Sequence, residues 1–270
     1  MAELIAFVGG GQMAGSLIGG LRAAGHAAAR IRVAEPDTAR AETLRRDFGV
    51  EVKSRAAEIG SGADALVLAV KPQVMKEAVA GLKPVASTTV VSIAAGVRID
   101  SLRSWLGGAA PIVRCMPNTP ALLRCGVTGL YAGDDTPAHS KALAEKILGA
   151  VGQTCWVKDE ALLDAVTALS GSGPAYYFLL TEALREAGQA LGLDAATARL
   201  LAERTLVGAG RMAELAGKDV AELRANVTSK GGTTEAAVAH LERHGLRKLF
   251  ADAVRAAQER ARELGAALAK

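Results

Sequence analysis

The first feature that could do chemistry is a polar, glycine-containing stretch near the C-terminal end, ANVTSKGGTTEAAV (residues 225–238). It holds hydroxyls and one lysine, but no histidine or cysteine that could act as a base or nucleophile. Gly231 and Gly232 free the backbone, and exposed N–H groups at a helix N-terminus bind small anions such as carboxylates. We therefore expect a carboxylate-binding loop followed by a helix, with Thr233 or Thr234 as its N-cap. A plain turn between two helices is the alternative interpretation.

A second stretch with chemical meaning lies near the N-terminus, in VGGGQMAG (residues 8–15). Gly9, Gly11 and Ala14 form a G-x-G-x-x-A pattern between an apolar run and a helical segment. In a strand–turn–helix unit this pattern brings a dinucleotide pyrophosphate to the backbone at the N-terminus of the helix. The sequence therefore predicts dinucleotide binding, although a merely tight turn would use the same small residues.

Glu35, directly after the second apolar run, is the residue expected to meet the ribose of the dinucleotide. A carboxylate there suits the free 2′-hydroxyl of NAD and repels the 2′-phosphate of NADP. Arg30, Arg32 and Arg40 are close in sequence and could offset this charge, and Glu35 could instead point to solvent. The sequence thus favours NADH only slightly over NADPH.

Apolar runs alternate with helical segments through the first half of the chain, which is typical of right-handed crossovers in a parallel sheet. The runs are almost continuously apolar, as expected of a sheet that is covered on both faces. We predict strands at residues 4–9, 30–36, 64–72, 88–96, 111–120 and 126–133, and helices at 12–25 and at 38–48, the latter closed by Gly49.

From about Glu160 the strand pattern ends and helical patterns follow. SGSGPA (170–175) should interrupt them, because its glycines and proline oppose a helix interior. Asp194 is the expected N-cap of a helix at 195–215, a shorter helix should open at Lys218 and Asp219, and the last should span 246–268.

The predicted fold class is α/β: a Rossmann-type, mostly parallel sheet domain (residues 1–159) followed by an all-α helical substrate-binding and dimerisation domain (160–270). The helical part contains more apolar helix than one small bundle can bury, so we expect a dimer interface to cover the remainder.

Composition narrows the class of partner. The net charge of the 270 residues is +4, but no Lys/Arg cluster occurs, so we expect no nucleic-acid partner. Cys115, Cys125 and Cys155 show no paired spacing, which favours reduced thiols in the cytoplasm. The N-terminal MAELIAFVGG has neither a basic region nor the length to span a bilayer, so we expect a soluble protein without a membrane partner.

Six motifs occur in an order that resembles the pyrroline-5-carboxylate reductase family. They span essentially the whole chain: GGGQMA (9–14), AVKPQ (69–73), SIAAGV (92–97), MPNTP (116–120), ALSGSGPAY (168–176) and VTSKGGTTEAAV (227–238). The resemblance implies hydride transfer from NADPH or NADH to the C=N carbon of 1-pyrroline-5-carboxylate, which gives L-proline in the last step of proline biosynthesis. A related imine or β-hydroxyacid reductase with the same two-domain plan is the alternative.

This reaction explains why acid–base residues are scarce. A cyclic imine is readily protonated, and the iminium accepts hydride without a strong catalytic acid. Catalysis then depends on holding the iminium carbon against the nicotinamide, which carries out the redox step.

The resemblance also implies roles for single residues. Thr234 would be the catalytic residue that orients or protonates the ring nitrogen, and Glu160 would favour the iminium cation unless it is only an exposed helix-start residue. The implied substrate-binding residues are Glu160, Ser229, Gly231, Gly232, Thr233 and Thr234. The implied cofactor-binding residues are Gly9, Gly10, Gly11, Gln12, Met13, Ala14, Glu35, Val70, Lys71, Pro72, Ala94, Ala95, Gly96 and Asn226.

The resemblance also implies an oligomeric state, and two positions of this chain differ from the family pattern. The resemblance implies a homodimer, with a homodecameric ring of dimers as the larger alternative. Lys230 stands where the family usually has proline, and Ala56 where it often has an asparagine near the adenosine. No metal site is expected, since His240 and His244 lack the glutamate that would directly follow the first histidine in a zinc protease motif.

Overall fold

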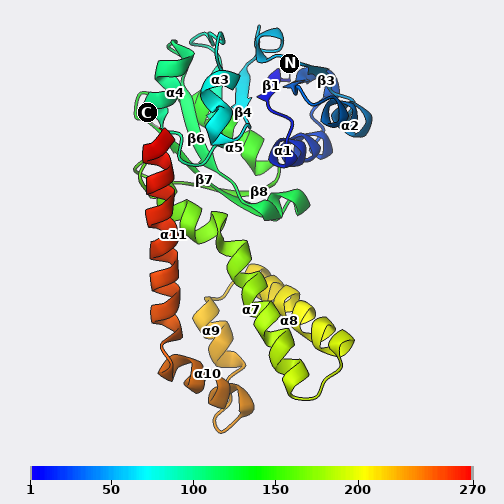
Figure 1. Ribbon diagram of the computed structural model, residues 1–270, viewed down its shortest axis with the longest axis vertical. Coiled ribbons are helices and arrows are strands. Elements are labelled where there is room, and N and C mark those ends of the chain that lie inside the picture. Colours follow the sequence, from blue (N-terminus) through cyan, green and yellow to red (C-terminus); the bar gives the residue numbers. More distant parts are fainter. Residues whose placement is uncertain (1, 269–270) are drawn as a thin grey trace. The chain divides into compact units, whose positions relative to one another are not determined.

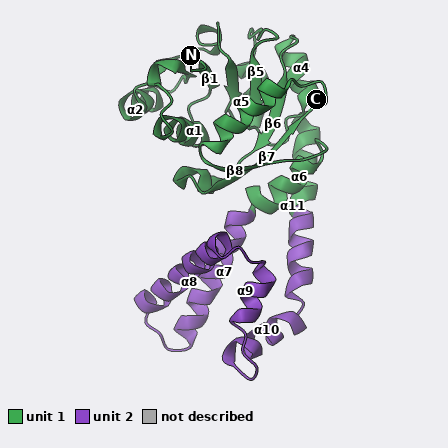
Figure 2. Cartoon of the chain, turned by 180° about the vertical axis from the view of Figure 1, so that it is seen from behind, with its two compact units in different colours: residues 1–172, 257–270 green, residues 173–256 purple. Residues whose placement is uncertain are grey.

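The structure is a computed structural model of the chain and describes residues 2–268. The chain forms two compact units, which are coloured separately in Figure 2. Unit 1 contains the residues up to Ser172 together with those from Ala257 onward, and unit 2 contains Gly173–Ala256.

An eight-stranded sheet in the order β3-β2-β1-β4-β5-β6-β7-β8 forms the centre of unit 1 (Figure 1). Its neighbouring strands are parallel, except that β6 and β7 run antiparallel. The prediction of a mostly parallel, Rossmann-type sheet is confirmed. The strands are β1 Ile5–Val8, β2 Ile31–Ala34, β3 Glu51–Lys53, β4 Ala65–Leu68, β5 Thr89–Ser92, β6 Ile112–Met116, β7 Gly126–Ala132 and β8 Gly152–Trp156.

The sequence did not predict the two strands at the edges of this sheet. β3 has one buried residue between two exposed ones, and β8 has no fully buried residue. An edge strand pairs on one side only and need not be apolar, so neither strand carries the continuous apolar run that marks the central strands.

Helices connect the strands and cover both faces of the sheet. The helices of unit 1 are α1 Gln12–Ala23, α2 Thr38–Phe48, α3 Met75–Ala78, α4 Ile99–Leu106, α5 Ala138–Gly149 and α6 Leu162–Val166. Short 3₁₀ turns lie at Ala28–Arg30, Ala56–Glu58, Pro72–Val74 and Thr119–Leu123, and a π-helical turn at Thr167–Gly171. Gly49 ends α2 in the left-handed conformation (φ 69°), as its position in the sequence predicts.

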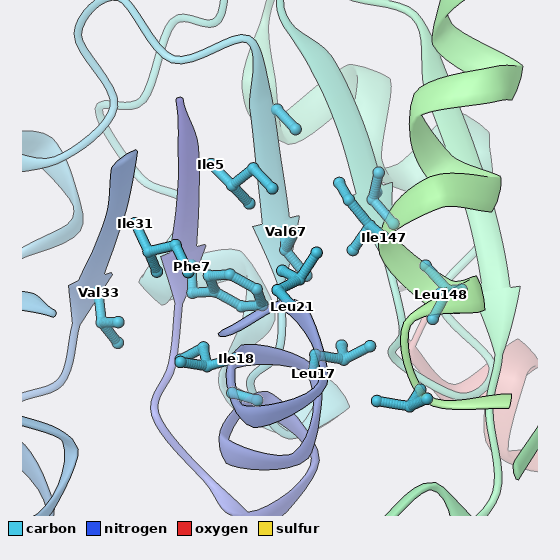
Figure 3. Close-up of a cluster of buried hydrophobic side chains, with 14 of the residues drawn as sticks. Ile5, Phe7, Leu17, Ile18, Leu21, Ile31, Val33, Val67, Ile147 and Leu148 are labelled. Atoms are coloured by element: carbon cyan, nitrogen blue, oxygen red, sulfur yellow. The ribbon is translucent and has the colours of Figure 1, made fainter. Parts of the chain in front are cut away.

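Two hydrophobic clusters, one on each face, hold the sheet between its helices. Ile5 and Phe7 of β1 contribute to the first cluster, while Ala6 and Val8 contribute to the second. The first cluster contains the buried sides of α1, α2 and α5, and Figure 3 shows Leu17, Ile18 and Leu21 of α1 beneath the strands. The second cluster contains side chains of α3 and α4. Burial on both faces fixes the register of the strands and thereby the positions of the loops at their carboxyl ends.

Unit 2 is entirely helical. Asp194 caps α8 by accepting hydrogen bonds from the N–H groups of Ala196 and Thr197, both at 3.0 Å. The sequence-based bounds 195–215 and 246–268 are confirmed, and SGSGPA lies at the π-helical turn and the start of the next helix. The helices are α7 Gly173–Ala190, α8 Ala195–Leu215, α9 Val220–Asn226, α10 Thr233–Arg243 and α11 Leu246–Leu268, of which α11 ends in unit 1.

The helices α7 and α8 leave much apolar surface exposed. Among the described residues of unit 2, the only buried hydrophobic side chains are Ala198 and Ala202. Large exposed ones include Tyr177, Phe178, Leu179, Leu180, Leu184, Leu200, Leu201, Val207, Met212 and Leu215. So many exposed large apolar side chains on two helices are typical of a protein interface. Between residues 2 and 268 no helix combines the length and the apolar character that crossing a membrane requires.

Candidate active site

The glycine turn between β1 and α1 lies at the carboxyl ends of the parallel strands. Gly9 has φ +99°, and its N–H donates to the Ala34 carbonyl at the end of β2 at 2.9 Å. A Cβ at Gly9 would lie 2.7 Å from Val70 Cγ1 and 2.8 Å from the Ala69 carbonyl oxygen after β4. Only glycine fits there, and the turn thereby brings three strand ends together.

The same turn leaves room for an anion. Gly11 is the N-cap of α1, no side chain caps this helix end, and a Cβ at Gly11 would meet no atom within 4 Å. The first N–H groups of a helix have no intrahelical partner and attract phosphate. Gly10, Gly11 and Gln12 line a groove of about 560 Å³ that continues along α1 and α2. The open N-terminus therefore fits the pyrophosphate of a dinucleotide.

Met13 and Ala14 contribute to packing between α1 and the sheet. Ala14 is fully buried in the first cluster, and Met13 packs against that cluster. These side chains hold α1 close to the sheet, as the small residue at the end of the G-x-G-x-x-A pattern should.

Glu35 lies beside the glycine turn, with a side chain only 5% exposed. Its Oε2 accepts a hydrogen bond from the Gly10 N–H at 2.9 Å, and its Oε1 accepts one from the Asp37 N–H, also at 2.9 Å. The Arg40 guanidinium, itself more than half exposed, is 3.4 Å from Oε1. The alternative in which Glu35 points to solvent is wrong: this carboxylate braces the turn.

The loops after β4 and β5 supply the remaining predicted cofactor residues of unit 1. Lys71 is exposed and precedes the 3₁₀ turn that Pro72 begins. Ala94 is buried in the second cluster, whereas Ala95 is exposed and Gly96 is buried with φ +77°. Of the Ala94–Ala95–Gly96 segment, Ala95 is thus the residue that presents its side chain to solvent.

Residues 227–232 of unit 2 form a tight turn into α10. Gly231 has φ +72°, and its N–H donates to Glu235 Oε2 at 2.7 Å. The Gly232 N–H donates to the Ser229 carbonyl at 3.0 Å. A Cβ at Gly232 would lie 2.6 Å from Ser229 Oγ, so a side chain at this position would displace the Ser229 hydroxyl.

The prediction that Thr233 or Thr234 caps α10 is wrong. The N-cap is Gly232, and Thr233 is already the first residue of the helix. The Gly231 amide is bound by Glu235, and Gly232 occupies the N-cap position, so the helix begins without a capping hydrogen bond from a threonine side chain. The first-turn amides of Thr233 and Thr234 then have no intrahelical acceptor.

Glu160 of unit 1 is part of an ion-pair cluster that the sequence did not reveal. Its Oε1 accepts hydrogen bonds from Arg114 Nη1 at 2.7 Å and from the Ile99 N–H at 2.8 Å. Arg114 is nearly buried, and the neighbouring pair Arg98–Asp164 has a separation of 3.0 Å. The arginine in the otherwise apolar IVRCM was the available signal, because a charge in a buried strand needs a partner.

The Cys115 thiol in β6 is inert. Cys115 follows Arg114 in β6 and is buried, and burial raises the pKa of its thiol well above the usual range. It is therefore no candidate nucleophile.

The structure thus gathers the predicted residues into two groups. Unit 1 holds the glycine turn, Glu35, the loops after β4 and β5, and Glu160. Unit 2 holds the exposed Asn226 and the turn from Ser229 to Thr234.

Comparison with known proteins identifies the family. Residues 160–264 match the family described as pyrroline-5-carboxylate reductase dimerisation, and residues 4–96 match NADP oxidoreductase coenzyme F420-dependent. The pyrroline-5-carboxylate reductase of Pseudomonas aeruginosa is 48% identical over 262 residues, which are 96% of each chain. The chain belongs to the pyrroline-5-carboxylate reductase family. It is therefore an oxidoreductase with a dimerisation domain, and the expected resemblance is confirmed.

Solved structures agree with this membership. A pyrroline-5-carboxylate reductase from Coxiella burnetii has a TM-score of 0.89 and 42% identity, covering 98% of this chain and 99% of that one. The pyrroline carboxylate reductase of Plasmodium falciparum, solved with NADP bound, has a TM-score of 0.83 and 28% identity over 97% of this chain and 98% of that one. The similarity thus extends over both units.

Proposed function

We propose that this chain reduces 1-pyrroline-5-carboxylate to L-proline by hydride transfer from NADH or NADPH, the last step of proline biosynthesis. The observation that carries the proposal is the glycine turn braced by Glu35, in a chain that belongs to the pyrroline-5-carboxylate reductase family along its whole length. A related imine or β-hydroxyacid reductase has no comparable support, because the reductive aminase and prephenate dehydrogenase neighbours, at 16–17% identity, share the fold alone.

The cofactor site that we propose is the carboxyl edge of the sheet. When bound, the nicotinamide supplies the hydride. The amides of Gly11, Gln12 and neighbouring residues would bind the pyrophosphate at the N-terminus of α1. The loops after β4 and β5 would line the dinucleotide through Val70, Lys71, Pro72, Ala94, Ala95 and Gly96, and the family resemblance assigns Asn226 to the same cofactor.

We expect both nicotinamide cofactors to be used, with NADH preferred. The Glu35 carboxylate is buried at the end of β2, where an acidic residue accepts hydrogen bonds from ribose hydroxyls and repels a 2′-phosphate. Arg40 offsets part of this charge, but it is mostly exposed, and water screens its field. Because Glu35 is buried and Arg40 is exposed, we expect the Glu35 carboxylate to affect the choice between NADH and NADPH more than Arg40 does.

The substrate site that we propose is the turn before α10. The unbonded first-turn amides of Thr233 and Thr234 are suited to the substrate carboxylate, together with the hydroxyl of Ser229. Gly231 and Gly232 would shape this site and add their amides only if their internal hydrogen bonds open. The Thr234 hydroxyl would then orient the ring nitrogen.

The resemblance implied that Glu160 favours the iminium cation, but its ion pair with Arg114 supports a different role. Its charge is balanced by Arg114, so it cannot favour a cation as strongly as an unpaired carboxylate would. We propose that Glu160 acts mainly within unit 1, by holding the start of α4 through the Ile99 amide.

We further propose a homodimer built through residues 160–270, with a ring of dimers as the larger form. The exposed apolar side chains of α7 and α8 support an interface there. We keep the domain boundary at residue 160, where the matched dimerisation region begins, although the compact units divide after Ser172. The free thiols of Cys115, Cys125 and Cys155 suit a cytoplasmic protein.

Steady-state kinetics tests the proposed function directly. The purified chain should reduce 1-pyrroline-5-carboxylate with NADH and with NADPH, and it should turn over other cyclic imines and 3-hydroxyacids far more slowly. Equal or faster turnover of those competitors would assign the chain to another reductase activity on the same fold.

A further inference from the structure

The last turns of α11 touch the loop that follows β5. Gly96 and Gly265 are both buried. A Cβ at Gly96 would lie 3.1 Å from Gly265 Cα and 3.2 Å from Gly265 N, and a Cβ at Gly265 would lie 3.1 Å from the Gly96 carbonyl oxygen. The two backbones therefore pack against each other with no side chain between them.

A second contact strengthens this one. Leu268, three residues further along α11 and hence on the same face of the helix, packs against the second hydrophobic cluster. That cluster contains Ala94 and Val97, which flank the loop, and Leu268 Cδ1 lies 3.5 Å from the Cβ position of Gly96. The end of α11 thus supports the loop from Ala94 to Val97.

Resting on the function proposed above, we propose that Gly265 is a positioning residue for the cofactor site. Gly96 is held at φ +77°, a conformation that few side-chain-bearing residues adopt, and Ala95 beside it is exposed where the cofactor would lie. The backbone of Gly265 sets how far the loop can approach α11, and hence where Ala95 and Gly96 meet the dinucleotide. Gly265 itself would touch neither cofactor nor substrate.

The contact between Gly265 and Gly96 joins a helix of the dimerisation region to a loop of the sheet domain. Gly265 follows directly after the matched dimerisation region, which ends at residue 264. The same helix begins in unit 2 and ends in unit 1. A helix of the dimerisation region therefore also supports a cofactor loop, so the last turns of α11 belong functionally to the dinucleotide site.

The test is the variant Gly265→Ala, with Gly149→Ala as the matched control. Gly149 is an exposed helical glycine of α5 with no atom within 4 Å of its Cβ position, so both changes add a methyl group to a helix but only one meets a neighbour. In Gly265→Ala the loop must yield by a few tenths of an ångström, because interiors are close-packed. Since small misplacements are costly at reacting centres, we expect the Kd for NADH to rise about three- to tenfold.

Two readouts separate positioning from general destabilisation. Fluorescence titration gives the NADH Kd, and steady-state kinetics at saturating NADH gives the KM for 1-pyrroline-5-carboxylate, which should change less than about twofold. Gly149→Ala should alter neither. Thermal unfolding checks that Gly265→Ala remains folded: alanine is the better helix former, but its methyl group meets the Gly96 carbonyl, so the two effects oppose each other and the melting temperature should stay close to that of the wild type.

A third variant keeps the proposal testable if Gly265→Ala folds poorly. Leu268→Ala removes support from the loop without adding bulk, and it should weaken NADH binding in the same direction by a smaller factor. Wild-type NADH affinity in a folded Gly265→Ala variant, or in Leu268→Ala where the first variant is unstable, overturns the proposal. Failure of the wild-type chain itself to bind NADH would instead overturn the proposed function.

Discussion

The molecule contains two glycine turns that each lead into a helix, and in each a glutamate binds a glycine amide. In the turn before α1, the Gly10 amide donates to Glu35, which follows a different strand and is nearly buried. In the turn before α10, the Gly231 amide donates to Glu235, four residues away on an exposed surface. The first brace depends on the whole sheet, and the second is local. Disturbing the first should therefore affect binding far more than disturbing the second.

Gly9→Ala should have the largest effect on binding, and Gly231→Ala is the variant to compare it with. Both residues have positive φ, but only a Cβ at Gly9 would meet a backbone carbonyl, at 2.8 Å. We expect Gly9→Ala to weaken NADH binding at least about 100-fold, or to prevent folding, since the backbone after β4 must move. Gly231→Ala has open space and should cost only the left-handed strain of about 1–2 kcal/mol, expressed in the KM for the substrate.

NADH titration and circular dichroism of both variants check this ranking. Similar NADH affinity in the two would show that the glycine turn of unit 1 is no more constrained than that of unit 2.

Thr234→Ala should have the next largest effect. Loss of the hydroxyl that orients the ring nitrogen should lower kcat/KM at least about tenfold, or about 1.4 kcal/mol. Thr233→Ala is the matched control, because Thr233 is proposed to act through its amide, which alanine retains. Equal activity of the two variants would remove Thr234 from its catalytic role.

Glu35→Gln should change cofactor preference. Glutamine keeps the size of the side chain but removes the negative charge that repels the 2′-phosphate of NADPH. The ratio of kcat/KM for NADPH to that for NADH should therefore rise about tenfold. Parallel kinetics with the two cofactors measures the ratio. If the ratio stays unchanged while NADH binding weakens, Glu35 acts only as the brace of the Gly10 amide.

Glu235→Gln should have a small effect. The glutamine carbonyl can still accept the Gly231 hydrogen bond, and the surrounding water moderates the loss of charge. We expect the KM for 1-pyrroline-5-carboxylate to change less than about threefold. A tenfold change in either direction would show that this local carboxylate governs substrate binding and would remove the contrast between the two braces.

Lys230→Pro should have the smallest effect. It restores the residue that the family usually carries in an exposed loop, and a proline with compatible backbone angles stabilises by restricting the unfolded chain. The variant should keep near-wild-type kcat/KM and an unchanged or higher melting temperature. An inactive but folded protein would mean that Lys230 itself contributes to the substrate site.

Features with short-range causes could be predicted from the sequence. Asp194 caps α8 and Gly49 ends α2 because each needs only neighbours within a helical turn. The glycine turn could be located because Gly9, Gly11 and Ala14 follow a buried strand. The capping role given to Thr233 or Thr234 was wrong because the Gly231–Gly232 pair offered a second way to begin the helix.

Features that join distant segments were beyond the sequence. The edge strands β3 and β8 have too little apolar pattern to be recognised alone, and only their pairing with β2 and β7 shows them to be strands. Glu160 could be named as a site residue, but its partners Arg114 and Ile99 come from other elements.

The sequence by itself determined the six central strands, the helices α1 and α2, the helical second half and the two glycine turns, because periodicity and local backbone preference are written in consecutive residues, and its ordered motifs indicated the reductase family. Only the tertiary structure decided which glutamate braces the Gly10 amide, that Arg114 neutralises Glu160, and that α11 ends against Gly96. These contacts arise when packing brings separate segments within a few ångströms, and no spacing along the chain encodes that distance.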